Sequence, residues 1–289
     1  MRWTPGGDSS DVEDRRGSSG FGGFGIGGGS IGCGGAVILL VLSLLFHKNF
    51  FALLGTGDQT GSGPVATRPV QETPEESTER QFVTFVLDDA QKTWTSVLSQ
   101  QSDASYHHAK LVLFRDSTSS GCGYAQAASG PFYCPEDEKV YIDLAFYDEL
   151  KQRFGASGDF AQAYVIAHEI GHHVQKILGI EEKVHSAMEG DSRHAKQYSV
   201  RLELQADCFA GIWAHSTQQR NLLDAGDVEE GLNAAAAVGD DRLQRMAGKT
   251  VNPDSFTHGS SAQRSSWFKR GFEAGRISDC DTFASGAVR

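Results

Sequence analysis

The sequence predicts an α+β domain that is rich in helix, contains a small sheet and is preceded by a single transmembrane helix. Several long segments place apolar residues at the spacing of an amphipathic helix, and two short apolar runs are typical of buried strands. An uncharged stretch, residues 21–46, is long enough to cross a bilayer, which needs about 20 apolar residues. The net charge of −11 argues against a nucleic acid partner, because the phosphate backbone would be repelled.

The N-terminal region is predicted to contribute nothing to the folded domain. Residues 1–30 are polar and then glycine-rich, a composition typical of a disordered tail. Residues 31–54 are interpreted as an uncleaved membrane anchor. A secretory signal and a buried core helix are the alternatives, but no A-x-A-like cleavage site follows, and a core helix would not stand between a tail and a linker. Three arginines before the span favour an N-terminus on the inside of the membrane, namely Arg2, Arg15 and Arg16.

The rest of the chain is predicted to be a linker followed by one domain. Residues 55–80 are rich in Gly, Pro, Ser, Thr and Glu, as linkers are. Residues 81–289 are numerous enough to bury one hydrophobic core. Helices are predicted for Gln81–Gln100, Ser157–Gly179, Tyr198–Thr217, Val228–Met246 and Ser261–Ala274. Strands are predicted for Lys110–Phe114 and Lys139–Phe146.

A metal-binding pattern lies in the second of these helices. Residues 168–172 read HEIGH, which is the pattern H-E-x-x-H. Histidines four residues apart share one helix face, so the imidazoles of His168 and His172 can bind one ion. Zinc lowers the pKa of its bound water to about 7, and Glu169 is placed to take the proton as general base. A helix with this polar face and no metal would only lose stability on burial. The sequence therefore predicts one catalytic Zn²⁺ ion.

The third ligand has to come from elsewhere in the chain, because catalytic zinc usually has three protein ligands and one open position. The long metzincin pattern needs a histidine six residues after His172, where Leu178 stands, so that pattern fails. Glu203 lies in the mostly apolar segment RLELQADCFAG and is predicted to bind zinc. Asp207, one turn later, would accept the far ring N–H of a ligand histidine. Rival ligands are disfavoured by their direction, surroundings or distance: His173, His185, His194 and His215.

Several motifs together resemble a known protein family. HEIGHHVQ, ELQADCFAG and PDSFTHGSSAQR, with the loop CGYAQAASGPFYCPEDEKVYID and the N-terminal VEDRRG, resemble the neutral zinc metallopeptidase family of membrane-anchored bacterial proteins. The resemblance implies a zinc peptidase that acts on protein or peptide substrates.

A wider likeness to the gluzincins, which include thermolysin, implies a gluzincin-like metallopeptidase domain. Gluzincins of the integral-membrane type have an E-x-x-A-D pattern, as Glu203–Asp207 does, and a Thr-His-Pro segment followed by Arg. Thr257–Gly259 with Arg264 is similar to that segment, except that glycine replaces proline. By this analogy His258 would stabilise the oxyanion of the tetrahedral intermediate; the alternative is that His258 caps or packs the following helix.

The cysteines predict disulfides. Cys122 and Cys134 bracket a glycine-containing loop, and a zinc site there would need a second cysteine pair. Cys208 and Cys280 are expected to form a second bridge, the alternative being that Cys208 is a buried thiol. Disulfides require an oxidising compartment, so the domain is expected outside the cytoplasmic membrane. The strand at Val140–Asp143, if it lies at a sheet edge, could bind an extended peptide.

These expectations combine into one hypothesis. The chain is predicted to be a single-pass protein of the cytoplasmic membrane with an extracytoplasmic zinc endopeptidase domain in residues 81–289. The alternative is a membrane-tethered binding or assembly factor with a structural zinc ion. The open fourth position argues against this alternative, because structural sites usually have four ligands rich in cysteine.

Overall fold

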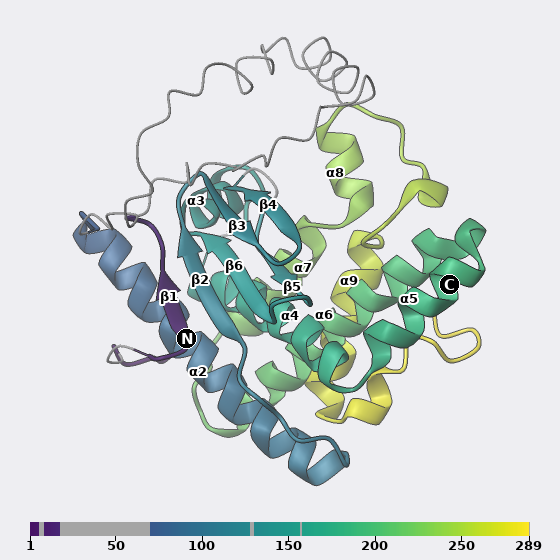
Figure 1. The fold of residues 1–289 in the computed structure, drawn as a ribbon, viewed down its shortest axis with the longest axis horizontal. Coiled ribbons are helices and arrows are strands. Elements are labelled where there is room, and N and C mark those ends of the chain that lie inside the picture. The colour runs from purple at the N-terminus through teal and green to yellow at the C-terminus, as the bar shows by residue number, and fades with distance from the viewer. Residues whose placement is uncertain (6–8, 18–69, 128–129, 157, 289) are drawn as a thin grey trace, which may run out of the picture. The chain divides into compact units, whose positions relative to one another are not determined.

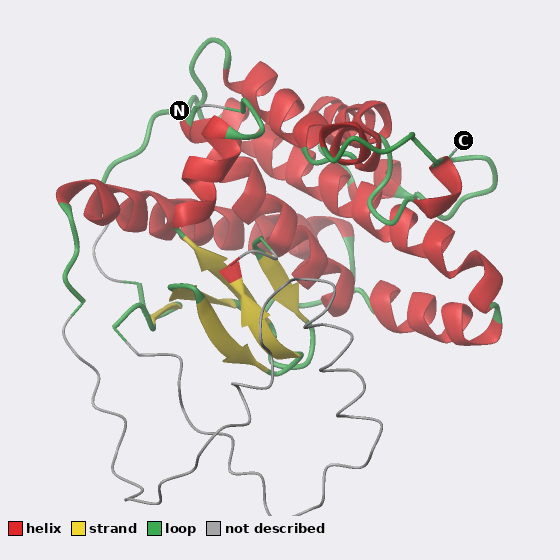
Figure 2. Cartoon of the chain, turned by 90° about the horizontal axis from the view of Figure 1, so that it is seen from above, coloured by secondary structure: helices red, strands yellow, loops and turns green. Residues whose placement is uncertain are grey.

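In the computed structural model, the residues described are 1–5, 9–17, 70–127, 130–156 and 158–288. Within them, helices dominate and are joined by one four-stranded sheet and one β-hairpin. Figure 2 shows the long helices gathered on one side of the strands. The predicted helix-rich α+β class with a small sheet is therefore confirmed.

The four-stranded sheet has the order β1-β2-β6-β5, in which β1, β2 and β6 are parallel and β5 is antiparallel to β6. The bounds are β1 Val12–Asp14, β2 Lys110–Phe114, β5 Phe132–Cys134 and β6 Lys139–Asp143; the separate hairpin consists of β3 Ser117–Ser120 and β4 Gly123–Gln126. Strand β6 lies between two others, so the expectation that this segment is an edge is wrong. Strand β5 is the edge on that side.

The central residues of the two predicted strands, Leu111–Phe114 and Val140–Ile142, are apolar or aromatic because both faces of the sheet are covered. One face of β2 and β6 joins the main core beneath the helices, through Leu111, Leu113, Val140 and Ile142. The other face belongs to a smaller cluster that contains Val112, Phe114 and Tyr141. Strand β6 ends at Asp143, whose carboxylate accepts the N–H of Ala145 at 3.0 Å, and a helix begins there instead of the predicted strand continuing to Phe146.

The helices are α2 Pro74–Gln101, α3 Ala145–Gln152, α4 Asp159–Ile177, α5 Ile180–Gly190, α6 Ala195–Gln219, α7 Asp227–Ala237, α8 Asp240–Met246 and α9 Ser261–Ala274. The predicted helix over Val228–Met246 is in fact two helices, α7 and α8. The chain turns at Gly239, where a Cβ atom would lie 2.3 Å from the backbone nitrogen of Ser261. Contact with the start of α9 therefore interrupts a pattern that locally favours one continuous helix.

Helix α2 begins inside the predicted linker of residues 55–80. Thr73 and Glu76 form a capping box, in which each side chain accepts the other's backbone N–H, and Pro74 occupies the first helical position. The linker prediction is therefore wrong for residues 74–80. These residues are polar because the first turns of α2 are largely exposed to solvent.

The prediction that residues 1–30 form a disordered tail is wrong for the N-terminal segment, which belongs to the same compact unit as the helices and the sheet. Figure 1 shows β1, in purple, beside β2. Ion pairs hold it there: Arg16 is buried and pairs with Asp14 at 2.5 Å and with Glu72 at 2.7 Å, and Lys139 pairs with Glu13 at 2.7 Å. The low apolar content indicated disorder, but charge pairing with the rest of the domain compensates.

The predicted anchor of residues 31–54 lies outside the described residues, as does most of the glycine-rich part of the tail. Among the helices of the described ranges, none combines the length and the apolar character needed to cross a membrane.

Close helix packing brings the candidate site together. A Cβ atom on Gly171 of α4 would lie 2.9 Å from the carbonyl oxygen of Ala206 in α6. A Cβ atom on Gly271 of α9 would lie 1.8 Å from the carbonyl oxygen of Cys208. Because glycine has no side chain, both helices approach α6 backbone to backbone. The metal-ligand motif of α4 and helix α9 therefore both pack directly against α6.

Candidate metal centre

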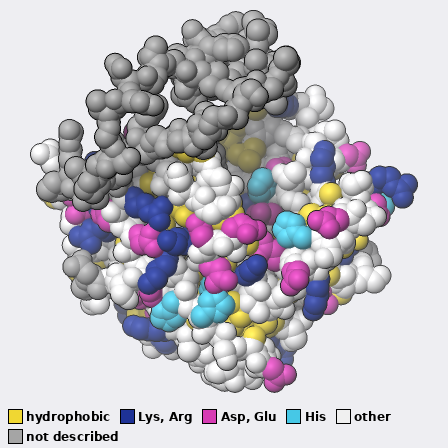
Figure 3. All heavy atoms as spheres, viewed as in Figure 1, with side chains coloured by type: hydrophobic (Ala, Val, Ile, Leu, Met, Phe, Trp, Pro, Cys, Tyr) yellow, Lys and Arg dark blue, Asp and Glu magenta, His cyan; other side chains and the backbone are white. Residues whose placement is uncertain are grey.

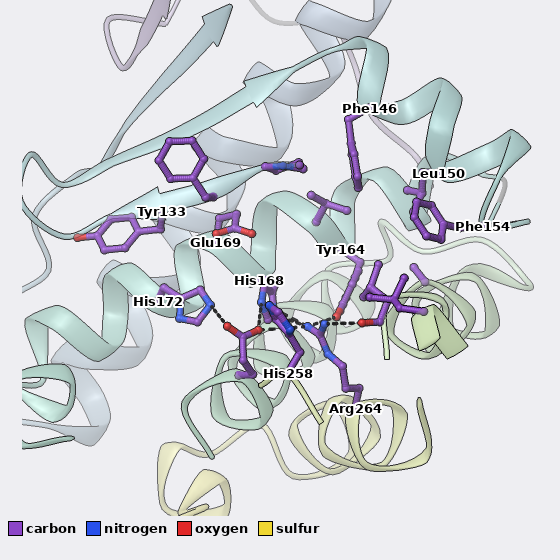
Figure 4. Close-up of a pocket in the computed structure, with 18 of the residues that line it drawn as sticks. Tyr133, Phe146, Leu150, Phe154, Tyr164, His168, Glu169, His172, His258 and Arg264 are labelled. Carbon is purple, nitrogen blue, oxygen red and sulfur yellow. Dashed lines mark hydrogen bonds and ion pairs between the residues drawn. The ribbon is translucent and has the colours of Figure 1, made fainter. Parts of the chain in front are cut away.

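His168 and His172 of α4 face Glu203 of α6 across the helix interface (Figure 4). The Nε2 atom of His168 lies 3.2 Å from Oε2 of Glu203, and Nε2 of His172 lies 3.5 Å from Oε1. One donor atom from each residue lies within 4.8 Å of the other two. Two ligands bound tetrahedrally to zinc at about 2.1 Å would be about 3.4 Å apart. The donor set and its spacing therefore fit a zinc ion.

In each of these histidines the other ring nitrogen, Nδ1, contacts a side chain that fixes the orientation of the ring. The Nδ1 atom of His168 lies 2.9 Å from Oδ1 of Asp207, which is the contact that the sequence predicts. The Nδ1 atom of His172 lies 2.9 Å from Oε1 of Gln175, a contact that the sequence analysis does not identify although the spacing of three residues on one helix permits it. Such contacts set the tautomer and direct both Nε2 atoms toward the same point.

Asp207 belongs to a fully buried charged group. Arg264 of α9 donates from Nε to Oδ2 of Asp207 at 2.8 Å and from Nη2 to Oδ1 at 2.9 Å, and Tyr164 also donates to Asp207. Burial alone would raise the pKa of Asp207, but Arg264 and His168 outweigh burial and lower it. Asp207 is therefore an ionised acceptor with paired charges around it. Sequence reasoning placed Arg264 near the site but assigned it no partner.

The charges of His168 and Glu203 strongly affect each other's pKa. Burial alone would lower the pKa of His168, but Asp207, together with Glu203, outweighs burial and raises it to about 10. Burial would raise the pKa of Glu203, but His172 and His168 hold it well below its usual range. In the metal-free site a proton on His168 therefore supplies positive charge between two carboxylates. A divalent cation would replace that proton.

His168, His172 and Glu203 line a cleft of about 640 Å³. Glu169 is nearly buried and borders the same cleft as His168 and His172 (Figure 4). The cleft extends along an apolar wall that includes Phe146, Leu150, Phe154, Val165 and Leu243. In the space-filling view, histidine and acidic side chains gather beside hydrophobic ones on this face (Figure 3). The Glu169 carboxylate and an apolar wall thus border one cavity.

His258 borders the cleft from the loop before α9, and Asp240 holds that loop. Oδ2 of Asp240 accepts the backbone N–H groups of Thr257 at 2.7 Å, His258 at 2.6 Å and Gly259 at 3.1 Å. Nδ1 of His258 lies 3.3 Å from Oδ1 of Asp240. The hydrogen bond to Asp240 raises the pKa of His258, against the effect of burial. The sequence analysis does not identify Asp240, because it stands 18 residues earlier in a segment read as one continuous helix.

His173 is fully buried and points away from the metal ligands, as its position on the helix predicts. Its Nε2 lies 2.8 Å from the carbonyl oxygen of His107, and its Nδ1 lies 3.0 Å from the hydroxyl of Tyr133 in β5. Burial lowers the pKa of His173 to about 4, so the ring is neutral at neutral pH. The other rival ligands contact residues other than His168, His172 and Glu203: His185 pairs with Glu181, His194 pairs with Asp191, and His215 contacts the carbonyl oxygen of Phe272.

Both predicted disulfides are present. Cys122 is bonded to Cys134 at the end of β5, with an S–S distance of 2.04 Å. Cys208 of α6 is bonded to Cys280, beyond α9, with an S–S distance of 1.98 Å. One bridge therefore lies at the edge of the sheet, and the other lies beside Asp207 on the metal-site helix.

Comparison with known proteins relates the chain to one family. The family described as "Putative neutral zinc metallopeptidase" matches residues 1–283. The uncharacterized protein YpfJ of Escherichia coli K12 is 48% identical over 288 residues, which cover 98% of this chain and 99% of that protein. An uncharacterized protein of Mycobacterium tuberculosis is 42% identical over 191 residues, which cover 62% of this chain and 64% of that protein. No solved structure matches the chain significantly.

Proposed function

The chain belongs to the neutral zinc metallopeptidase family, and from this premise we propose that it is a zinc-dependent endopeptidase of the gluzincin type. The substrates of such an enzyme are proteins or peptides. One observation carries the proposal: donor atoms of His168, His172 and Glu203 converge in a cleft that Glu169 also borders. Three protein donors leave one coordination position open, as catalytic zinc sites do.

His168, His172 and Glu203 would hold the zinc ion, while Asp207 and Gln175 keep the two imidazoles directed toward it. A bound zinc ion supplies Lewis acidity and lowers the pKa of a coordinated water to about 7. Glu169 follows the first ligand directly in the helix and would accept the proton of the attacking water. The same carboxyl group would then deliver that proton to the leaving amine.

His258 would stabilise the oxyanion of the tetrahedral intermediate. Asp240 accepts from Nδ1 of His258, so Nε2 can donate to an oxyanion when the ring is protonated, a state that the raised pKa of His258 favours. Asp240 also accepts three backbone N–H groups around His258, and this fixes the loop that presents the imidazole to the cleft. A donor that is positioned before the reaction stabilises developing charge without reorganisation.

The substrate backbone would pair with β5, since β5 is the strand that borders the cleft. Phe132 and Tyr133 of β5 line the cleft, and β5 pairs with β6 on one side only. An extended peptide that adds to the free side of an edge strand gains main-chain hydrogen bonds independent of its sequence. Apolar side chains of the peptide would then contact the wall around Phe146 and Leu150.

The domain would work in an oxidising compartment outside the cytoplasm. Two disulfides support this location, because they form and persist where thiols are not kept reduced. The negative net charge is consistent with protein substrates rather than nucleic acid.

The Glu169→Gln variant tests the mechanism. Glutamine has nearly the same shape and lacks the base, so zinc content is expected to stay unchanged while cleavage of unfolded casein falls by about 10²–10⁴-fold. Glu149→Gln is the matched control, because Glu149 lies exposed in the same cleft and has no assigned role. Zinc is measured by elemental analysis and cleavage by release of soluble peptides.

Two outcomes would contradict the proposal. Cleavage by Glu169→Gln at the rate of the parent protein would remove Glu169 from the mechanism. If the zinc-loaded parent protein left unfolded casein intact both with and without a chelator, a structural zinc in a binding or assembly factor would be the better account.

A further inference from the structure

His173 directly follows the ligand pattern of residues 168–172 and is not one of the proposed metal ligands. It is nevertheless the most completely buried polar side chain of that turn. It is 0% exposed, and both ring nitrogens have partners from other parts of the fold. Its neighbour His172 faces the cleft. Consecutive residues point about 100° apart around a helix, so one turn of α4 supplies a metal ligand on one side and a structural contact on the other.

The surroundings of His173 contain groups that can bind metals, but the hydrogen bonds exclude that use of His173. Nitrogen and carboxylate atoms of His107, Glu138 and His173 lie close together. A carbonyl oxygen only accepts, so Nε2 of His173 must carry the proton donated to His107. In the neutral ring Nδ1 is then the acceptor of the Tyr133 hydroxyl. Neither nitrogen of His173 has a free lone pair, while His107 and Glu138 pair with each other at 2.6 Å.

These two hydrogen bonds join α4 to β5 and to the segment before β2, the two strands that flank β6. The Tyr133 hydroxyl belongs to β5, and the His107 carbonyl belongs to the segment that leads into β2. The ring of Tyr106 packs edge-on against His173, with a centroid distance of 5.5 Å. Strand β5 has only three residues paired with β6. A strand this short gains much of its fixed position from contacts outside its ladder.

We propose that His173 is a positioning residue that fixes edge strand β5 relative to the metal-site turn of α4, so that a peptide paired with β5 lies against His172 and Glu169. This inference rests on the proposed function, in which β5 binds the substrate backbone. Tyr133 and Glu169 both line the cleft (Figure 4). A shift of β5 along α4 would therefore misplace an extended substrate without changing the metal ligands.

The variants His173→Phe and Tyr133→Phe test the role of the contact. His173→Phe removes both hydrogen bonds, Tyr133→Phe removes one and keeps the ring, and His173→Gln retains one donor and one acceptor. Loss of one such bond is expected to weaken binding of an extended peptide about fivefold, corresponding to about 1 kcal/mol. His173→Phe is expected to weaken it more, and His173→Gln is expected to restore most of the loss. Adding Tyr133→Phe to His173→Phe should have no further effect.

Binding is measured separately from catalysis. Each variant is combined with Glu169→Gln in the full-length, zinc-loaded protein, and the affinity for fluorescein-labelled unfolded casein is measured by anisotropy. Cleavage of a blocked dipeptide, which is too short to pair along β5, is measured with Glu169 intact. The expected pattern for His173→Phe is weaker casein binding, unchanged zinc content and unchanged turnover of the dipeptide.

Three results would overturn the positioning role. The first is a casein affinity equal to that of the parent in both His173→Phe and Tyr133→Phe. The second is a loss of dipeptide turnover in His173→Phe as large as its loss of casein affinity. The third is loss of zinc from Tyr133→Phe. Because casein affinity is measured without catalysis, these results are distinct from a failure of the proposed chemistry, which would appear as an intact substrate in the parent protein. Tyr133→Phe keeps the test decisive if His173→Phe does not fold.

Discussion

The two ligand histidines lie one helical turn apart, yet they are supported in opposite ways. His168 is held by Asp207, a buried carboxylate paired with Arg264 from another helix. His172 is held by Gln175, a neutral side chain of the same helix, whose Nε2 donates to the carbonyl of Leu202 at 2.8 Å. One support is charged and joins α4, α6 and α9, whereas the other is neutral and joins only α4 and α6.

This difference separates two properties of the site. On the His168 side, metal affinity, proton affinity and fold stability depend on the same buried charges. On the His172 side, the neutral amide of Gln175 contacts Nδ1 and orients the ring. A zinc site of this kind can thus be disturbed on one side through electrostatics and on the other through orientation alone.

The largest effect is expected from Arg264→Met. The substitution removes the cation that pairs with buried Asp207, and loss of one partner of a buried ion pair usually costs about 3–5 kcal/mol. Because Tyr164 and the His168 proton still contact Asp207, we expect the lower end, about 3 kcal/mol. The free energy of unfolding of the metal-free protein is measured with denaturant, with both disulfides intact.

Arg245→Met provides the matched control, because Arg245 forms an exposed ion pair with Asp241. Its loss is expected to change stability by less than about 1 kcal/mol. Similar effects of the two substitutions would show that the charged support of His168 contributes no more than a surface pair.

The next effect concerns pH. The pKa of His168 is raised to about 10 in the metal-free protein, so its proton stabilises the metal-free fold fully below about pH 6.5 and this stabilisation is lost as the pH rises through 10. Zinc must displace that proton. Zinc affinity should therefore rise about tenfold per pH unit between pH 7 and 9.

Competition with a chelator of known pH dependence measures this slope. Asp207→Asn removes the carboxylate that raises the pKa of His168 and should flatten the slope above pH 7. An equally flat slope in the parent protein would mean that His168 is already neutral there.

The smallest effect is expected from Gln175→Leu on the neutral side. Removing the partner of a ligand histidine costs at least about tenfold in metal affinity, and we expect no change in its pH slope, because Gln175 carries no charge. Gln219→Leu, on the exposed surface of α6, is the control. A changed slope in Gln175→Leu would show that the two sides are electrostatically coupled after all.

The long helices were predictable because each has a periodic apolar face that is legible within one segment. Helices α4 and α9 match the predicted segments closely, α6 extends a few residues beyond its segment at each end, and α2 begins seven residues before its predicted start. Strands β1 and β5 were not predictable because each has only three residues, and β1 also depends on a partner strand far away in the sequence. Helix α5 was not predicted because its surface is charged and only Val184 is buried.

In the site, prediction succeeded where chemistry follows local spacing. His168, Glu169 and His172 share one turn, and Glu203 and Asp207 are acids four residues apart in an apolar helix. Asp240 and the Tyr133–His173 contact involve partners brought together only by the tertiary fold, and no periodic pattern marks them. The assignment of roles to these residues stays a prediction that the experiments above test.

The pairing of β1 with β2 limits how this chain can meet a membrane. Val12–Asp14 precede the apolar residues 31–54 and Lys110–Phe114 follow them, yet the two strands share one ladder. Both strands therefore lie on the same side of any membrane that the protein meets. Arg2, Arg15 and Arg16 each form an ion pair within the folded unit.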